Sequence, residues 1–101
     1  APRVHNPGHW TIEGAATSQF ENHIRAIVGL PLGSTAAIGH SGMVNFIGTM
    51  PAAEAVLSVP GAHFHSYGKA PRPNRKIGHC TVTATSPAER DKALRRVLKA
   101  L

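Results

Sequence analysis

Two helix-start signals constrain how this chain of 101 residues can fold. Ser18 is followed three residues later by Glu21, and Ser86 is followed in the same way by Glu89. This spacing fits a capping box, which satisfies backbone N–H groups that lack partners at a helix start. Between the two signals, alternating segments are broken by Pro and Gly, a pattern typical of strands and turns. The sequence therefore predicts a small α+β fold with two main helices and about three strands.

The two helices differ in how they end and in the residues they are expected to bury. The first should stop at Gly29 and Pro31, because neither residue continues a helix. Its predicted buried stripe follows helical spacing and consists of Phe20, Ile24, Ile27 and Val28. The closing helix begins with proline in its first turn. Its predicted stripe consists of Leu94, Val97, Leu98 and Leu101.

Three segments have the pattern of strands. Residues 43–49 (MVNFIGT) are apolar and partly β-branched, which predicts a buried strand. Residues 62–69 (AHFHSYGK) and 76–85 (KIGHCTVTAT) alternate, and we expect them to pair antiparallel around a loop whose two prolines cannot join a ladder. A short helix with proline in its first turn is expected at 51–57, and an ordered loop or irregular strand at 1–16. The inward face of the last strand is predicted to hold Gly78, Cys80, Val82 and Ala84.

The charge balance favours anionic partners. Eleven Lys and Arg oppose five Asp and Glu, which gives a net charge of +6. Residues 69–76 hold four cations and no acid, and Pro71 and Pro73 stiffen the loop. A rigid loop can hold Lys69 and Arg75 towards one phosphate, although a solvated charged loop explains the pattern equally well. The few aromatic residues do not recur near the cations, which argues against a nucleic-acid partner.

Other composition features exclude several classes of protein. No apolar run approaches the roughly 20 residues that cross a bilayer, so no membrane partner is expected. The single Cys80 excludes an internal disulfide and favours a reducing compartment, the cytoplasm. Seven histidines suggest metal binding, and His63 and His65 share a predicted strand face. Pro7 and Gly8 argue against a helix that would bring His5 and His9 together, and no Asp or Glu lies close by to complete a site. We therefore predict no metal site in this chain.

Three long stretches resemble the 5-(carboxyamino)imidazole ribonucleotide synthase family, the ATP-grasp carboxylases of purine synthesis. They are APRVHNPGHWTIEGAATSQFENHIRAIVGLPLG, MVNFIG and YGKAPRPNRKIGHCTV, which together cover nearly the whole chain. Pro7 stands where the family usually has serine and stiffens its loop. Asn74 stands where the family often has glycine, so we expect Asn74 to adopt the left-handed conformation that asparagine tolerates.

The resemblance implies an ATP-dependent reaction. ATP and bicarbonate form carboxyphosphate, which carboxylates the exocyclic amine of 5-aminoimidazole ribonucleotide and releases ADP and phosphate. The resemblance also implies ATP and Mg as cofactors of the complete enzyme and a homodimeric parent. Because the family's metal-binding glutamate would precede Ala1 by two residues, we expect a C-terminal fragment that is inactive alone. Residues 1–17 would end the active-site loop, and residues 18–101 would form a C-terminal helix-plus-β subdomain, a rudimentary barrel-sandwich hybrid.

The same resemblance implies roles for two groups of residues. Arg3 would hold bicarbonate through its forked guanidinium, His5 would transfer a proton or anchor the loop, and Asn6 would hydrogen-bond substrate. A second group would bind the ribonucleotide 5′-phosphate, and it consists of Lys69, Arg75 and Lys76. A different class of protein remains open at this point: a free-standing basic module that binds phosphorylated ligands or nucleic acid.

Overall fold

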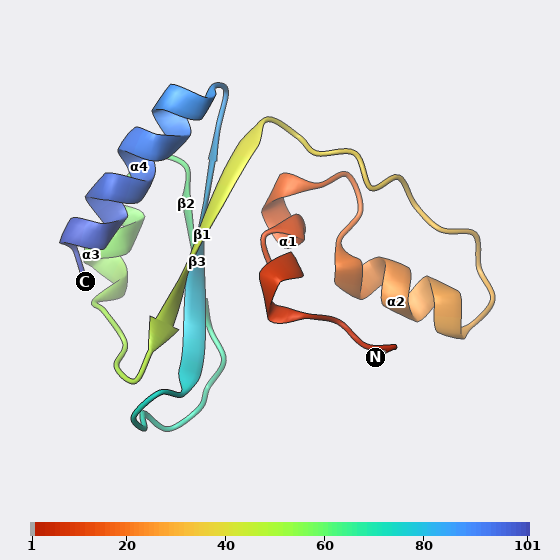
Figure 1. Cartoon of the computed structure of the whole chain (residues 1–101), viewed down its shortest axis with the longest axis horizontal. Coiled ribbons are helices and arrows are strands. Elements are labelled where there is room, and N and C mark those ends of the chain that lie inside the picture. Colours follow the sequence, from red (N-terminus) through yellow and green to blue (C-terminus); the bar gives the residue numbers. More distant parts are fainter. Residues whose placement is uncertain (1) are drawn as a thin grey trace.

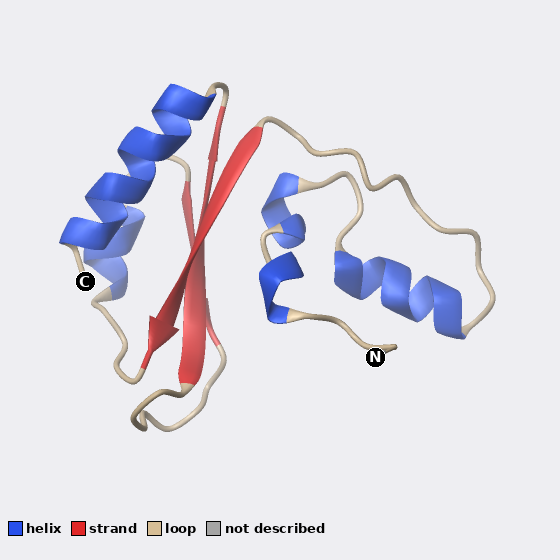
Figure 2. Ribbon diagram, viewed as in Figure 1, coloured by secondary structure: helices blue, strands red, loops and turns tan. Residues whose placement is uncertain are grey.

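The computed structural model describes residues 2–101 and contains a central three-stranded antiparallel sheet in the order β1-β3-β2 (Figure 1). The strands are β1 (His40–Ile47), β2 (Ala62–Ser66) and β3 (Lys76–Ala84). One side of the sheet is covered by α3 (Ala53–Leu57) and α4 (Pro87–Lys99) (Figure 2). The other side holds the N-terminal elements, which are η1 (Asn6–Gly8), α1 (Thr11–Gly14) and α2 (Gln19–Ile27). The predicted α+β architecture and the antiparallel pair are confirmed.

The register gives the sheet one apolar face and one polar face. Cys80 in β3 lies opposite Val44 in β1 and Phe64 in β2. One step along β3, His79 lies opposite Asn45 and His65, whose side chains point to the other face because neighbouring residues in a strand alternate. The first row packs against the helices α3 and α4, whereas the second row faces the N-terminal elements.

The apolar core lies between the sheet and the helices α3 and α4. Its fully buried members include Val56 from α3 and Val97 from α4. The stripe predicted for the closing helix is wrong in part, because Leu98 and Leu101 are 54% and 56% exposed. The buried line runs through Ala93 and Val97, four residues apart, and Leu98 is rotated by roughly 100° from it.

Both predicted helix starts are confirmed. The Ser18 hydroxyl accepts a hydrogen bond from the Glu21 N–H at 3.1 Å, and the Ser86 hydroxyl accepts one from the Glu89 N–H at 3.2 Å. The short helix near residues 51–57 also forms, but Pro51 precedes its cap residue and does not lie in its first turn. At the proline loop, Asn74 has a φ of 64° and adopts the expected left-handed conformation.

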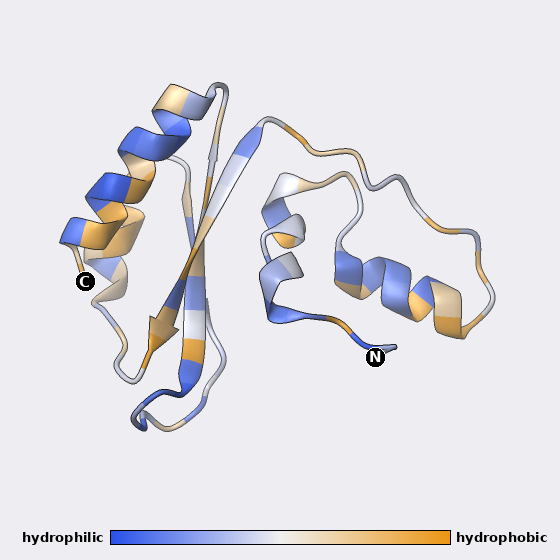
Figure 3. Cartoon of the chain, in the orientation of Figure 1, coloured by the Kyte–Doolittle hydropathy of each residue, from blue (hydrophilic) through white to orange (hydrophobic). Residues whose placement is uncertain are grey.

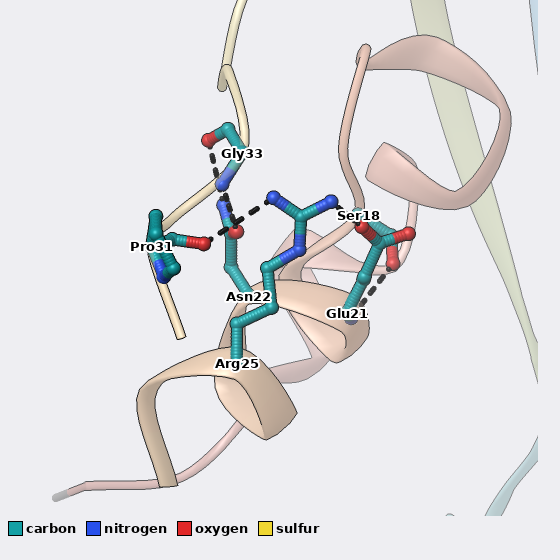
Figure 4. Close-up of polar contacts among 6 residues, drawn as sticks. All are labelled: Ser18, Glu21, Asn22, Arg25, Pro31 and Gly33. Carbon is teal, nitrogen blue, oxygen red and sulfur yellow. Dashed lines mark hydrogen bonds and ion pairs between the residues drawn. The ribbon is translucent and has the colours of Figure 1, made fainter. Parts of the chain in front are cut away.

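Polar contacts fix the loop that follows α2 (Figure 4). The Asn22 carboxamide accepts a hydrogen bond from the Gly33 N–H at 2.8 Å and donates one to the Gly33 carbonyl at 3.2 Å. Arg25 forms an ion pair with Glu21 and donates to the Pro31 carbonyl at 3.3 Å. The loop therefore returns alongside α2 without an apolar core of its own.

The buried stripe predicted for α2 is wrong. Ile24, Ile27 and Val28 are 58%, 66% and 61% exposed, and Figure 3 shows this apolar end of α2 far from the sheet. Phe20 is the exception, since it is half-buried and its ring centroid lies 5.1 Å from that of His9. The apolar spacing is real, but α1 lies between α2 and the sheet and leaves the stripe without a partner in residues 2–101.

The N-terminal segment contains two short helical turns where a loop or irregular strand was expected. Pro7 lies in the first turn of η1, where a missing N–H needs no partner. The Thr11 hydroxyl donates to the Gly8 carbonyl at 2.6 Å and accepts from the Gln19 N–H at 3.0 Å. Single turns are too short to create an apolar period, which explains why the sequence pattern did not predict them. Within residues 2–101, no helix is long and apolar enough to cross a bilayer.

Candidate functional site

Two groups of residues that the sequence separates meet where β3 begins. The Lys76 ammonium donates a hydrogen bond to the Asn6 side-chain oxygen at 3.3 Å. The Asn6 side-chain nitrogen donates in turn to the Asn45 side-chain oxygen at 3.0 Å. The sequence analysis assigned Asn6 to the active-site loop and Lys76 to the predicted phosphate-binding residues. The structure brings these two side chains into direct contact although they are 70 positions apart in the sequence. Asn45 was not singled out from the sequence.

The other two residues of the N-terminal group are exposed. Arg3 donates one hydrogen bond to the neighbouring Val4 carbonyl at 3.1 Å, and its guanidinium makes no other hydrogen bond within residues 2–101. Gln19 anchors the main chain of His5, because the His5 N–H donates to Oε1 at 3.1 Å and the His5 carbonyl accepts from Nε2 at 2.8 Å. The loop is thus anchored through the His5 backbone, and the exposed imidazole makes no hydrogen bond within residues 2–101.

The cations of the basic loop, residues 69–76, differ in their burial and in their contacts. Arg75 is half-buried and donates to the Ala70 carbonyl at 3.2 Å, so it braces the loop that carries it. Lys69 is exposed, and its ammonium lies 5.7 Å from the centroid of the Tyr67 ring, within the range of a cation–π contact. Lys76 is exposed on the side of Asn6. Lys69 and Lys76 therefore lie at the two ends of the loop, residues 69–76, and the hydrogen bond from Arg75 to Ala70 stabilises the conformation of the loop.

A cluster of polar side chains covers the neighbouring part of the sheet. The His65 Nε2 atom lies 3.0 and 3.1 Å from the two Glu13 carboxylate oxygens. The His65 ring stacks on the His79 ring with centroids 4.5 Å apart, and His79 Nδ1 lies 2.7 Å from the Tyr67 hydroxyl. Strand alternation could have placed His65 beside His79, but no sequence signal connects Glu13 with a strand that begins 49 residues later at Ala62.

Burial sets the charge state of this cluster. Burial, with smaller contributions from the nearby His65 and His9, lowers the pKa of His79 to about 4. Burial also lowers the pKa of His9, with smaller effects from His65 and Lys76, and it raises the pKa of the Tyr67 hydroxyl. His79 is therefore neutral at pH 7, and the shift at His9 favours its neutral form. A cavity of about 430 Å³ opens beside this cluster and is lined by His9, Ile12, Phe20, His65, Tyr67 and Lys69.

The same cluster is the arrangement that most resembles a metal site. Ligand atoms of Glu13, His65 and His79 all lie within 4.8 Å of one another. The two imidazole rings, however, are stacked with planes only 19° apart, so their nitrogen lone pairs lie in nearly parallel planes. One ion cannot lie in both ring planes, whereas a bound metal needs ligands that converge. The geometry suits a hydrogen-bonded support better than a metal centre.

The comparisons with known proteins decide the family. Residues 41–93 match the family model of the phosphoribosylaminoimidazole carboxylase C-terminal domain. The chain belongs to this family. The matched range contains the positions of Asn45, Lys69, Arg75 and Lys76.

Members of the phosphoribosylaminoimidazole carboxylase family and their solved structures are close to this chain. The N5-carboxyaminoimidazole ribonucleotide synthase of Pseudomonas aeruginosa is 59% identical over 87% of this chain, which covers 24% of that relative. The crystal structure of the Thermus thermophilus synthetase matches all of this chain, and 28% of its own, with a TM-score of 0.97 and 58% identity. The chain therefore spans about a quarter of the length of the relatives it matches.

A third similar structure was solved with ligands. The N5-carboxyaminoimidazole synthase of Aspergillus clavatus, in complex with ADP and 5-aminoimidazole ribonucleotide, matches 96% of this chain and 28% of its own, with a TM-score of 0.89 and 44% identity. The resemblance found in the sequence is thus confirmed at the level of the family and of the fold.

Proposed function

We propose that this chain forms the C-terminal part of an ATP-grasp ligase that carboxylates 5-aminoimidazole ribonucleotide with bicarbonate in purine synthesis. The observation that supports the proposal is the Asn6–Lys76 hydrogen bond, which joins the proposed active-site loop to the proposed phosphate-binding residues. Synthases of this reaction share up to 59% identity with the chain among the relatives described above. A single site that handles a phosphorylated substrate and a reactive anion requires both groups side by side.

The residues divide the proposed work according to their chemistry. Lys69 and Lys76 bind the 5′-phosphate as point charges, while Arg75 adds charge and keeps the loop in shape. Arg3 holds bicarbonate and then carboxyphosphate, a short-lived anion that needs fixed positive charge. The free imidazole of His5 accepts or donates the proton that moves when the exocyclic amine is carboxylated.

The residues described here do not suit a magnesium site. Glu13 is engaged by His65 and Glu21 by Arg25, and no carboxylate contacts the candidate site residues within residues 2–101. We therefore propose that other parts of the complete enzyme hold Mg·ATP, so that this chain alone does not hydrolyse ATP. We further propose that the complete enzyme is a homodimer and acts in the cytoplasm, where it would use cellular ATP.

The alternative of a free-standing basic module is not favoured. Its strongest support was the run of cations in residues 69–76, but Arg75 braces its own loop and Lys76 contacts Asn6. A general nucleic-acid surface would leave its cations free and add aromatic stacking partners. The family match favours the ligase instead, and in our proposal the same cations bind one small phosphorylated substrate.

A chimaera tests the proposed function. The matching segment of the Thermus thermophilus synthetase is replaced by this chain, and ADP release is measured with ATP, bicarbonate and 5-aminoimidazole ribonucleotide. We expect release that depends on both bicarbonate and ribonucleotide. The isolated chain serves as the control and should show none. A correctly folded chimaera without ribonucleotide-dependent turnover would contradict the proposal, as would turnover by the isolated chain.

A further inference from the structure

Asn45 occupies a central place in the site although it carries no charge. It lies in β1 opposite His79 in β3, on the polar face of the sheet, and it is half-buried. Its side-chain oxygen accepts the hydrogen bond from Asn6, whose own oxygen accepts from Lys76. These three side chains form a row, the amide clamp, that runs from β1 through the N-terminal segment to the start of β3.

The direction of every hydrogen bond in the amide clamp is fixed. An ammonium group has donors and no acceptor, so Lys76 requires the oxygen of the Asn6 carboxamide to face it. The Asn6 nitrogen must then face Asn45, and Asn45 must present its oxygen. A flipped Asn6 would bring N–H against ammonium at one end and oxygen against oxygen at the other. The clamp therefore has one favourable orientation.

We propose that Asn45 is a positioning residue that holds the Asn6 carboxamide, and with it the active-site loop, in register with the cations at the start of β3. This inference rests on the proposed function. Asn45 belongs to a strand that is hydrogen-bonded along its length to β3, whereas Asn6 lies in a single 3₁₀ turn. A rigid strand defines a position more accurately than a short turn.

The amide clamp leaves capacity for substrate. Lys76 uses one of its three donors for Asn6 and retains two for a phosphate oxygen. The second N–H of Asn6 is not needed by the clamp and is available to a bound ligand. Without Asn45, the Asn6 carboxamide can rotate, and the Lys76 ammonium loses a fixed partner. Binding of the ribonucleotide would then include the cost of ordering both groups.

Kinetics of the chimaera test the inference. Asn45→Leu removes the acceptor at similar volume, and we expect it to raise the KM for ribonucleotide about three- to tenfold, the effect of one neutral hydrogen bond. The KM for ATP should not change. Asn45→Asp retains an oxygen acceptor and should stay within about twofold of the parent. Asn22→Leu is the matched control, because its carboxamide fixes only the loop after α2. The inference is wrong if Asn45→Leu leaves the KM unchanged or if the Leu and Asp variants raise it equally.

A second measurement is independent of catalysis. In NMR spectra of the 101-residue chain, the Asn6 side-chain amide protons should exchange with solvent several-fold faster in Asn45→Leu than in the parent or in Asn22→Leu. Unchanged exchange would overturn the amide clamp even if the chimaera is active. Conversely, an inactive parent chimaera with slow Asn6 exchange would contradict the proposed function while the clamp stands.

Discussion

His65 on β2 lies within hydrogen-bond distance of both carboxylate oxygens of Glu13 on α1, at 3.0 and 3.1 Å. Only 14% of the Glu13 side chain is exposed, so the pair lies largely between the two layers. Together with the Asn6–Asn45 hydrogen bond, it attaches the N-terminal segment to the polar face of the sheet. This attachment depends on polar geometry, whereas α4 is attached by apolar packing.

Removing the charge of Glu13 should loosen the N-terminal segment. Glu13→Gln retains one oxygen but loses the charge-assisted bond, and we expect a loss of about 1–2 kcal/mol in the free energy of unfolding. Amide exchange in residues 2–16 should become faster. Glu21→Gln is the matched control, because its ion pair with Arg25 is exposed and should contribute less than about 0.5 kcal/mol. Equal losses in both variants would contradict the role assigned to Glu13.

Acid should destabilise the chain through His79. The pKa of His79 is about 4 when the chain is folded, against 6.5 ordinarily, so the unfolded state binds more protons between these values. The free energy of unfolding should therefore fall by up to about 3 kcal/mol as the pH decreases from about 7 to about 4. His9, whose pKa is also lowered, acts in the same direction.

Urea unfolding at several pH values checks this expectation. His79→Gln should flatten the pH dependence, while His40→Gln, at an exposed position, should leave it as in the parent. A parent chain that is equally stable at pH 4.5 and pH 7 would show that His79 is not held neutral by the fold.

Alanine substitutions at two glycines should distinguish the cost of backbone strain from the cost of a steric clash. Gly61 and Gly29 have φ values of 83° and 76°, a conformation that costs about 1 kcal/mol for alanine. A Cβ atom at Gly61 would overlap the Thr83 carbonyl oxygen, whereas at Gly29 it would meet nothing within 4 Å. In thermal unfolding, we expect Gly29→Ala to cost about 1 kcal/mol and Gly61→Ala clearly more. Similar costs would mean that the turn before β2 moves easily.

Neighbouring residues of α4 should differ sharply in their contribution to stability. Val97 is fully buried, so Val97→Ala should lower the free energy of unfolding by about 2–3 kcal/mol. Leu98 is 54% exposed, and Leu98→Ala should cost less than about 1 kcal/mol although it removes a larger side chain. Denaturation midpoints of the two variants check the orientation of α4, and the reverse order would place the wrong face of the helix in the core.

The candidate site residues should separate into two kinetic classes in the chimaera. Lys69→Ala or Lys76→Ala removes a charge-assisted phosphate contact, and we expect ribonucleotide affinity to fall about ten- to a hundredfold. Arg3→Ala should chiefly lower the rate of ADP release, since its charge acts on an anion that forms during the reaction. Arg95→Ala, at an exposed position of α4, is the control. Unchanged ribonucleotide affinity in both lysine variants would make the loop an ordinary charged surface.

Local rules in the sequence predicted most of the secondary structure. Ser18 and Ser86 each act through backbone groups within three residues, so both caps could be predicted from the sequence alone. The left-handed conformation of Asn74 was expected from the glycine that the family often has at that position. Alternation likewise predicted β2 and β3, because strand faces follow from period two alone. These features do not depend on what the rest of the chain does.

What could not be predicted depends on contacts between distant segments. The spacing of Ile24 and Ile27 indicates an apolar face but not whether anything covers it, and in this structure both side chains remain exposed. The partners Glu13 and His65 are 52 residues apart, and Asn6 and Lys76 are 70 apart. One-dimensional periodicity holds no information on such pairs, so the sequence indicated Asn6 and Lys76 as candidates without showing that they touch.

The order β1-β3-β2 places the last strand of the sequence in the middle of the sheet. Within residues 2–101, β1 and β2 pair only with β3, so both remain unpaired in this segment until Lys76–Ala84 has left the ribosome, and α4 follows directly after β3. During synthesis both strands therefore have unpaired backbone groups for some time, and exposed unpaired strands can aggregate or pair incorrectly. Asn45 on β1 and His65 on β2 place polar side chains on one face of these strands, which reduces the apolar surface that the strands expose before β3 pairs with them.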